Sequence, residues 1–263
     1  GSISAKLQAR GEDEHRQALE SLVRPYRERL RIRAEVLVGR TFLETVRAVI
    51  RNSHDLVIKP SENPDYLERL FGSDDMHLLR KCPCPVWLMK AEEKPNYERI
   101  LAAIDFDQEP LDQEPNANIL ELSSSLALSD FAELHLVHAW DAPGEMLLRY
   151  RSDSQTAAQY VRSEHSRHQQ AMNAVQHRLR ERIGQDAHDY LAPHYHLIQG
   201  TARQVIPQTA RRLQADLVVM GTLARTGIPG FFIGNTAEAI LEQLQCSLLA
   251  IKPAGFVSPV TVE

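Results

Sequence analysis

An internal repeat is the feature of this 263-residue chain that most constrains its fold. The segment DLVI at 55–58 recurs as DLVV at 216–219, an offset of 161 residues. Further along, CPVWLMK at 84–90 corresponds to CSLLAIK at 246–252, with an offset of 162 residues. One single-residue gap therefore aligns two long stretches. Because the matches are collinear, we predict a tandem duplication in which both copies share one fold.

The second copy shows the pattern of strands that alternate with helices. Predicted strands are 99–106, 133–140, 194–199, 215–220 and 247–251, and predicted helices are 119–128, 155–183, 202–213 and 235–244. Nearly continuous apolar strands that alternate with helices are typical of a parallel sheet covered on both faces. We therefore predict an α/β fold with a doubly wound, five-stranded, Rossmann-like parallel sheet. Ligands of such sheets bind beyond the carboxyl ends of the strands.

We expect the first copy to be truncated at its N-terminus. Its predicted elements are a helix at 14–30, a strand at 34–38, a helix at 42–50, and strands at 55–59 and 86–89. The repeat offset places the counterpart of Asp105 before residue 1, so the opening strand, first helix and second strand are expected to be missing. We divide the chain into residues 1–93, the C-terminal part of a first domain, and residues 94–263, a complete second domain.

Composition excludes several classes of protein. With 30 Lys and Arg against 35 Asp and Glu, the net charge of −5 argues against a general affinity for nucleic acid. No apolar run reaches the roughly 18 residues that a membrane span needs. Cys82, Cys84 and Cys246 are too few for a disulfide scaffold. We expect a cytoplasmic protein with reduced thiols.

A glycine-rich segment at 220–236 follows a predicted strand and opens a predicted helix. Glycines allow the backbone to approach a phosphate closely, and the N–H groups at a helix start favour anions. Arg225 would add positive charge, and Asn235 and Thr236 would cap the helix or donate to phosphate oxygens. The alternative is a tight turn at 227–230 with Asn235 as an ordinary N-cap. The residues alone leave both interpretations open.

The spacing of this segment resembles the nucleotide-binding loop of the universal stress proteins. That loop has a glycine, two residues, a glycine, nine residues, and then glycine followed by Ser or Thr. The match sets Gly221, Ala224, Gly234 and Asn235 at the four positions, with the spacing kept and two identities changed. The tandem layout and the stretch 226–237 are most similar to the E-type branch in proteobacteria.

The resemblance implies an adenine nucleotide alpha hydrolase-like fold and a site for ATP or AMP, with Mg²⁺ accompanying ATP. It sets Asp105, at the end of the first strand, against the adenosine, and it sets Ala139 of the second strand beside the adenine. Ala224 adds a methyl group where the family keeps glycine, and Asn235 replaces a hydroxyl with an amide. In the first copy the segment 57–60 replaces the glycine start, so we expect that copy not to bind ATP by this route.

The resemblance also implies an assembly. Fifth strands commonly pair in this family, so the strand at 86–89 is expected to meet residues 248–251 as an intramolecular pseudo-dimer. Such pairing would bury two exposed sheet edges. The apolar tail at 256–260 is expected to extend along the seam. Association of two chains as a homodimer stays open.

Other candidate residues have structural explanations. The pair Cys82 and Cys84 lacks the two-residue spacer of redox and zinc sites, and Cys84 has a repeat partner in Cys246, so we interpret it as a small buried residue. His165 and His168 lie beside Glu164 on one helix, where a solvated face is the simpler explanation than a metal site. We expect surface or packing roles for His194 and His196, and we expect His138 to face a neighbouring element. Phe231 and Phe232 would pack or, if exposed, form a contact site for a partner or a lipid.

Three functions are compatible with these observations. The first is a regulatory protein that binds an adenine nucleotide during stress. The second is a nucleotide-independent scaffold or a carrier of an apolar ligand. The third is a slow ATP hydrolase, which is disfavoured because no general base or nucleophile is predicted near the loop and no P-loop pattern is present. We predict a non-enzymatic stress-response protein without catalytic or metal-binding residues.

Overall fold

The structure of the protein is a computed structural model, which describes residues 2–62, 72–90, 96–106, 116–151, 154–222, 233–253 and 255–262. The chain divides into two compact units, residues 1–45 and residues 46–263. In the part of the chain that the structure describes, no helix is long and apolar enough to cross a membrane.

The first unit consists of a long helix followed by an irregular segment. Helix α1 (Ser2–Val23) leads into a 3-10 turn, η1 (Arg24–Tyr26). The helix ends before the predicted residue 30 because Pro25 lies in the first turn of η1, and proline lacks the N–H that an α-helix requires. The predicted strand at 34–38 is wrong, since residues 27–40 form neither helix nor strand. Its counterpart in the second copy, β5, pairs with β4, whereas residues 34–38 pair with no strand among the described residues.

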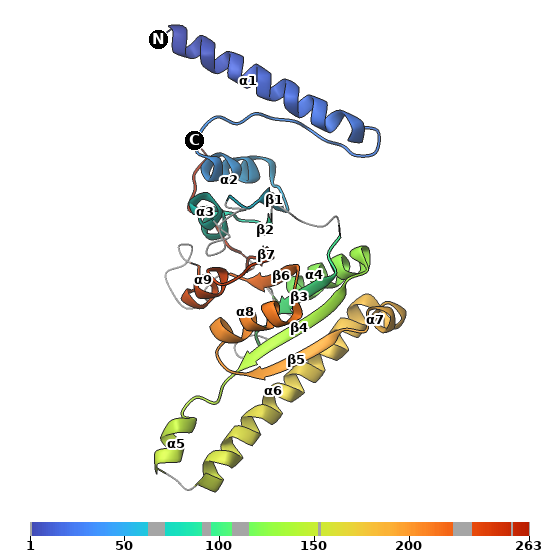
Figure 1. Cartoon of the computed structure of the whole chain (residues 1–263), viewed down its shortest axis with the longest axis vertical. Coiled ribbons are helices and arrows are strands. Elements are labelled where there is room, and N and C mark those ends of the chain that lie inside the picture. The colour runs from blue at the N-terminus through green and yellow to red at the C-terminus, as the bar shows by residue number, and fades with distance from the viewer. Residues whose placement is uncertain are drawn as a thin grey trace. The chain divides into compact units, whose positions relative to one another are not determined.

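The second unit is built on one seven-stranded sheet (Figure 1). Its strands are β1 (Val57–Pro60), β2 (Val86–Met89), β3 (Arg99–Ala103), β4 (Glu133–Trp140), β5 (His194–Gln199), β6 (Leu217–Gly221) and β7 (Ser247–Ile251). Their order across the sheet is β1-β2-β7-β6-β3-β4-β5. Strands β3 to β7 are the predicted five parallel strands, and β1 and β2 of the first copy extend the same sheet.

Eight helices are described from residue 41 onward. They are α2 (Thr41–Asn52), α3 (Ser73–Lys81), α4 (Asn116–Asp130), α5 (Glu145–Arg151), α6 (Ser154–Ile183), α7 (Gln185–Leu191), α8 (Ala202–Leu213) and α9 (Asn235–Leu241). Helices α3, α5 and α7 were not predicted, because nine or seven residues are too few to show a clear helical period. The long helix α6 and helix α8 match their predictions closely, and α8 continues through Pro207.

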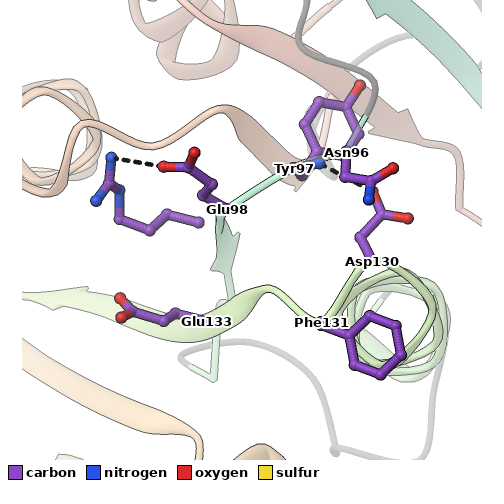
Figure 2. Close-up of a pocket in the computed structure, with 7 residues that line it drawn as sticks. Asn96, Tyr97, Glu98, Asp130, Phe131 and Glu133 are labelled. Atoms are coloured by element: carbon purple, nitrogen blue, oxygen red, sulfur yellow. Dashed lines mark hydrogen bonds and ion pairs between the residues drawn. The ribbon is translucent and has the colours of Figure 1, made fainter.

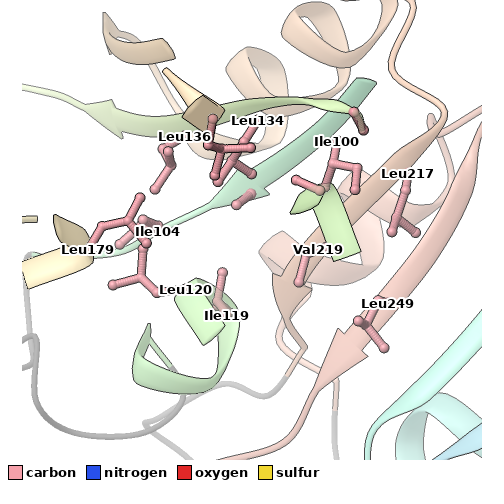
Figure 3. Close-up of a cluster of buried hydrophobic side chains, with 14 of the residues drawn as sticks. Ile100, Ile104, Ile119, Leu120, Leu134, Leu136, Leu179, Leu217, Val219 and Leu249 are labelled. Carbon is pink, nitrogen blue, oxygen red and sulfur yellow. The ribbon is translucent and has the colours of Figure 1, made fainter. Parts of the chain in front are cut away.

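The main hydrophobic core lies between the sheet and helices α4 and α6 (Figure 3). It takes alternate residues from the central strands, among them Ile100, Leu134 and Leu217, because successive strand residues point to opposite faces. Ile119 of α4 and Leu179 of α6 close it. Helix α8 contacts β3 and β4 and packs beside α9. The sheet is thus doubly wound, as predicted.

The seam between the two copies is an antiparallel pair of strands, β2 and β7. These are the two fifth strands that the sequence analysis expected to meet. The register pairs Val86 with Ala250, Trp87 with Leu249, and Leu88 with Leu248. Trp87 and Leu249 correspond to each other in the repeat, so the pairing is symmetric about them, as in a two-fold interface.

Polar contacts reinforce this seam. The backbone N–H of Lys90 donates to Ser247 Oγ at 2.8 Å. Arg80 of α3 forms an ion pair with Glu238 of α9. The tail at 256–260, expected to extend along the seam, forms no strand. Instead the carbonyl of Thr261 accepts a hydrogen bond from Arg47 of α2 at 3.4 Å.

Candidate functional site

The order of the strands reverses beside β3. From β3 the chain proceeds outward to β4 and β5 on one side, and it then returns to β6 and β7 on the other. Connections in opposite directions leave a crevice at the carboxyl ends of the two strands that flank the switch, here β3 and β6. The register pairs Ile100 with Leu217 and Ala102 with Val219, so both strands end at the same level. The crevice therefore lies above the ends of β3 and β6.

Asp105 lies at the carboxyl end of β3, and hydrogen bonds to its backbone fix its position. The side chain of buried Asn116, the first residue of α4, donates from Nδ2 to the Asp105 carbonyl at 2.6 Å. In return, Asn116 Oδ1 accepts the Asp105 N–H at 3.3 Å. This reciprocal pair fixes the strand end, and the Asp105 side chain is exposed. Sequence reasoning missed Asn116, although a polar residue shortly after a strand end was a usable signal.

Ala139 lies on the other side of Asp105 from β6. It belongs to β4, where it pairs with Ile198 of β5 and is half-buried. The register of β3 with β4 ends at the pair Ala103 and Val137, so Ala139 lies two residues beyond that pair. The predicted adenine-side residue is thus one strand away from Asp105 at the same edge of the sheet.

The two ends of the glycine-rich segment are tied together. The N–H of Gly234 donates to the Thr222 carbonyl at 3.1 Å, and the Thr222 N–H donates to the Ile251 carbonyl at 3.3 Å. Thr222 is fully buried and anchors the base of the segment, a role that sequence reasoning missed. Gly221 precedes it as the last residue of β6.

Gly234 is the N-cap of α9, with extended backbone. Asn235 is therefore the first helical residue, and interpreting it as the N-cap is wrong. Asn235 and Thr236 are both exposed. Ala224, Arg225, Phe231 and Phe232 lie outside the described residues.

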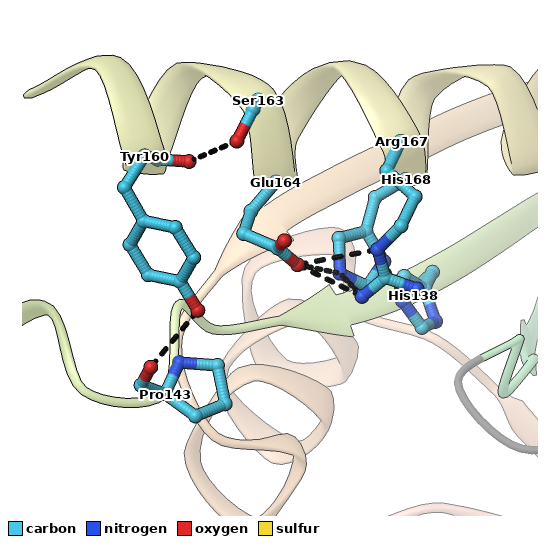
Figure 4. Close-up of polar contacts among 7 residues, drawn as sticks. All are labelled: His138, Pro143, Tyr160, Ser163, Glu164, Arg167 and His168. Carbon is cyan, nitrogen blue, oxygen red and sulfur yellow. Dashed lines mark hydrogen bonds and ion pairs between the residues drawn. The ribbon is translucent and has the colours of Figure 1, made fainter.

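A buried chain of hydrogen bonds runs beneath this edge (Figure 4). His138 Nδ1 lies 2.9 Å from the carbonyl of Ile104, the residue before Asp105. His138 Nε2 lies 3.0 Å from His168 Nδ1 of α6, and His168 Nε2 lies 3.0 Å from the Arg167 guanidinium. A carbonyl only accepts and a guanidinium only donates, so both ends of the chain impose one direction. Each histidine then donates from Nδ1 and accepts at Nε2, which is the neutral form.

These hydrogen bonds show that the interpretation of His168 as part of a solvated face of α6 is wrong. His168 is only 1% exposed, whereas His165 is exposed and its ring packs edge-on against Trp140 with centroids 5.4 Å apart. The ring of Phe106 covers His138 at a centroid distance of 4.1 Å. Among the described residues, no group of three His, Cys, Asp or Glu side chains is arranged to hold a metal ion.

A second histidine cluster lies toward the outer edge of the sheet. His135 of β4 stacks on His194 and His196 of β5, with centroids 4.8 and 5.3 Å apart, and this confirms that the two β5 histidines share one face. Burial lowers the pKa of His196 to about 4, with the neighbouring His135 adding to the effect. Burial also lowers the pKa of His135. The rings of His135 and His196 therefore pack in the neutral form.

An open cavity of about 610 Å³ lies at the opposite edge of the sheet, at the amino ends of β3 and β4 (Figure 2). One of its carboxylates binds the backbone: Asp130 accepts the Tyr97 N–H at 3.0 Å. Nearby Asp216 likewise accepts the N–H groups of Glu98 and Arg99 at 2.9 Å. These contacts anchor the start of β3, so we place the candidate site at the carboxyl edge instead.

The comparison with known proteins decides the family. A model described as "Universal stress protein family" matches residues 96–252, which is more than half of the chain. The chain belongs to the universal stress protein family. Universal stress protein E of Escherichia coli K12 is 35% identical over 230 residues, which cover 86% of this chain and 69% of the relative. That of Photorhabdus laumondii is 32% identical over 227 residues, covering 84% and 69%.

Solved structures agree with this assignment. A functionally unknown protein of Pseudomonas aeruginosa PAO1 superposes with a TM-score of 0.66 at 27% identity, covering 91% of this chain and 78% of that one. A universal stress protein from Archaeoglobus fulgidus gives a TM-score of 0.57 at 17% identity, covering 96% and 78%, and supports the fold alone. The chain is thus an E-type universal stress protein by similarity, with the predicted α/β fold.

Proposed function

We propose that this universal stress protein is a non-enzymatic stress-response protein that binds an adenine nucleotide, ATP or AMP, at the carboxyl edge of its second domain. One observation carries the proposal: the order of the strands reverses between β3 and β6, where Asp105 and the base of the glycine-rich segment emerge side by side. The spacing of Gly221, Ala224 and Gly234 supports a phosphate-facing loop at the same place.

Each residue has a role in the proposed site. Asp105, held by Asn116, would accept hydrogen bonds from the ribose hydroxyls or the adenine amine. Ala139 is small enough to leave room for the base beside it. Gly234 already donates its N–H to Thr222, so the phosphate would be held by Arg225, Asn235 and Thr236 and by the loop backbone. Mg²⁺ would accompany ATP through the phosphates.

The two copies are proposed to act as one pseudo-dimer. The symmetric register about Trp87 and Leu249 supports this view, because isologous pairing is what two equivalent strands produce across a two-fold axis. We also propose that the boundary between the two domains lies between residues 93 and 94. Only the second copy retains the glycine start of the loop, so one nucleotide per chain is expected.

Calorimetric titration of ATP and AMP, with and without Mg²⁺, tests the proposal. We expect micromolar binding with one site per chain, and we expect Asp105→Asn to weaken it at least tenfold, about 1.4 kcal/mol. Glu133→Gln, at the opposite edge, is the matched control and should bind like the unmodified protein. Binding only by an Ala224→Gly variant would mean that the methyl group closes the loop.

If neither the unmodified protein nor the Ala224→Gly variant binds ATP or AMP, the nucleotide proposal is contradicted. It would favour the second function, a nucleotide-independent scaffold or a carrier of an apolar ligand. Release of inorganic phosphate from ATP, measured in the same samples, would favour slow hydrolysis over the non-enzymatic proposal.

A further inference from the structure

Cys82 and Cys84 hold two thiols side by side at the end of helix α3. Their sulfur atoms are 3.6 Å apart. Cys82 is the C-cap of α3, where its N–H donates to the Leu78 carbonyl at 2.9 Å, and Pro83 restricts the chain between the two thiols. Cys82 is fully buried, whereas Cys84 is 8% exposed. The pair is therefore held ready at a fixed separation.

A buried cation from the other copy contacts the helix that carries the pair. The Lys252 ammonium donates to the Leu79 carbonyl in α3 and lies 3.4 Å from Thr222 Oγ1. It also lies 5.2 Å from the centre of the Phe256 ring. The hydrogen bond from Cys84 lowers the pKa of Cys82 against the effect of burial, and Lys252 lowers it further. The hydrogen bond to Cys82, together with burial, raises the pKa of Cys84, so Cys82 is the more acidic of the two thiols.

The repeat shows that packing alone does not require this pair. Cys84 corresponds to Cys246, and both are 8% exposed, so a small buried residue suits that position in each copy. Cys82 corresponds to Leu244, which is buried in the second copy. An apolar side chain therefore fills the place of Cys82 in the same fold. The second sulfur is specific to the first copy.

We propose that Cys82 and Cys84 are a redox-active dithiol that a small hydroperoxide oxidises to an intramolecular disulfide. Cys84, at 8% exposure, is the more accessible of the two residues, so a small oxidant would approach the pair from its side. The Cys82 thiolate attacks the outer oxygen of the hydroperoxide, the O–O bond breaks, and the alcohol leaves with the proton that Cys82 released. Cys82 then carries a sulfenic acid.

The second step closes the bridge. Cys84 sulfur attacks the Cys82 sulfur, the S–S bond forms, the S–O bond breaks, and hydroxide leaves as water with the proton of Cys84. Two thiols and one hydroperoxide thus give one disulfide, one alcohol and one water. Since a disulfide bond is about 2.05 Å long, the two sulfurs approach by roughly 1.5 Å.

Peptide mapping after hydrogen peroxide treatment tests this inference on the full chain. Trypsin cleaves after Lys81 and Lys90, so one peptide, residues 82–90, carries both thiols, while Cys246 lies in another. Folded protein is exposed to graded peroxide, alkylated under denaturing conditions and digested. We expect the 82–90 peptide to lose both alkylation sites together and to have the mass of the unalkylated peptide less two hydrogens. This loss should be at least ten times faster than the loss of the alkylation site at Cys246. Dithiothreitol should restore both sites.

Two variants separate the steps. Cys84→Ser should stop at the sulfenic acid of Cys82, which dimedone labels, and Cys246→Ser should form the bridge at the unmodified rate. The proposal would be overturned if peroxide left all three cysteines unmodified or oxidised all three at the same rate. A disulfide between Cys82 and Cys246, or between two chains, would also overturn it.

Discussion

At the residue scale, the buried histidines determine how the strand ends are held. The chain from Arg167 through His168 and His138 to the Ile104 carbonyl joins helix α6 to the end of β3, one residue before Asp105. Neither histidine was predicted to have this role, because a strand pattern and a helix pattern give no sign that two rings thirty residues apart will meet. Only the packing of α6 on the sheet brings them together.

Replacing His168 should therefore cost more stability than its place on a polar helix suggests. His168→Leu removes the partner that His138 Nε2 has at 3.0 Å in the core, and we expect a loss of about 1–3 kcal/mol in the free energy of unfolding. His177→Leu, on the exposed side of the same helix, should change it by less than about 0.5 kcal/mol. Urea unfolding at pH 7 measures both. If His168→Leu lowered the free energy of unfolding by no more than His177→Leu, the hydrogen bonds of His168 would contribute nothing to stability.

The outer histidine cluster should make stability depend on pH. The folded pKa of His196 is about 4, below its ordinary value of 6.5, so below pH 6.5 the unfolded chain takes up a proton that the folded protein resists. Stability should therefore fall as the pH drops from about 6.5 toward 4, and this residue should have no effect above that range. Allowing for partial exposure of the ring, we expect about 1 kcal/mol at pH 5.

Urea unfolding of the protein and of His196→Gln, at pH 7 and at pH 5, checks this effect. The variant should lose less stability between the two pH values. A loss of the same size in the variant would assign the pH dependence to other groups.

At the element scale, helix α8 shows how a proline is accommodated. Pro207 cannot donate to the carbonyl of Arg203, four residues earlier, and that carbonyl accepts instead from Gln243 Nε2 at 3.2 Å. The sequence predicted the helix but could not show which side chain replaces the missing donor, because Gln243 follows α9, forty residues away. The external hydrogen bond explains why the helix continues through the proline.

A double-mutant cycle tests this compensation. Gln243→Ala should lower the free energy of unfolding by about 1 kcal/mol in the presence of Pro207. In a Pro207→Ala background the helix supplies its own N–H, so Gln243→Ala should cost about 0.5 kcal/mol less. Thermal or urea unfolding of the four proteins gives the coupling. Strict additivity would mean that Gln243 stabilises α8 for another reason.

At the scale of the whole molecule, most of the sheet could be predicted because apolar strands and the repeat both appear directly in the residue pattern. Strands β2, β4, β5 and β7 begin and end where the pattern placed them. The strand predicted at 34–38 is wrong because a strand needs a partner, and the local residue pattern does not reveal whether one exists. For the candidate site, the family resemblance proposes Asp105, Gly221 and Gly234, whereas Asn116 and Thr222 act through contacts across the fold.

The seam explains why the first copy shares a sheet with the second. All five residues of β7 are buried, and β2 covers its outer edge. A chain limited to residues 96–263 would expose this edge, and we expect two such chains to pair through β7 in the symmetric register now formed by β2 and β7. Light scattering should show a dimer of the shortened chain at micromolar concentration. A stable monomer would contradict the idea that this edge requires a partner.

The central claim is that the carboxyl ends of β3 and β6 form the ligand site of this universal stress protein. Hydrogen exchange with and without saturating ATP tests it most directly, because protection reports where the ligand orders the backbone. We predict slower exchange at residues 104–106, 220–222 and 233–236, and no change at residues 96–99 and 130–133 around the opposite cavity. Protection at the opposite cavity, or none anywhere despite measured binding, would contradict the claim.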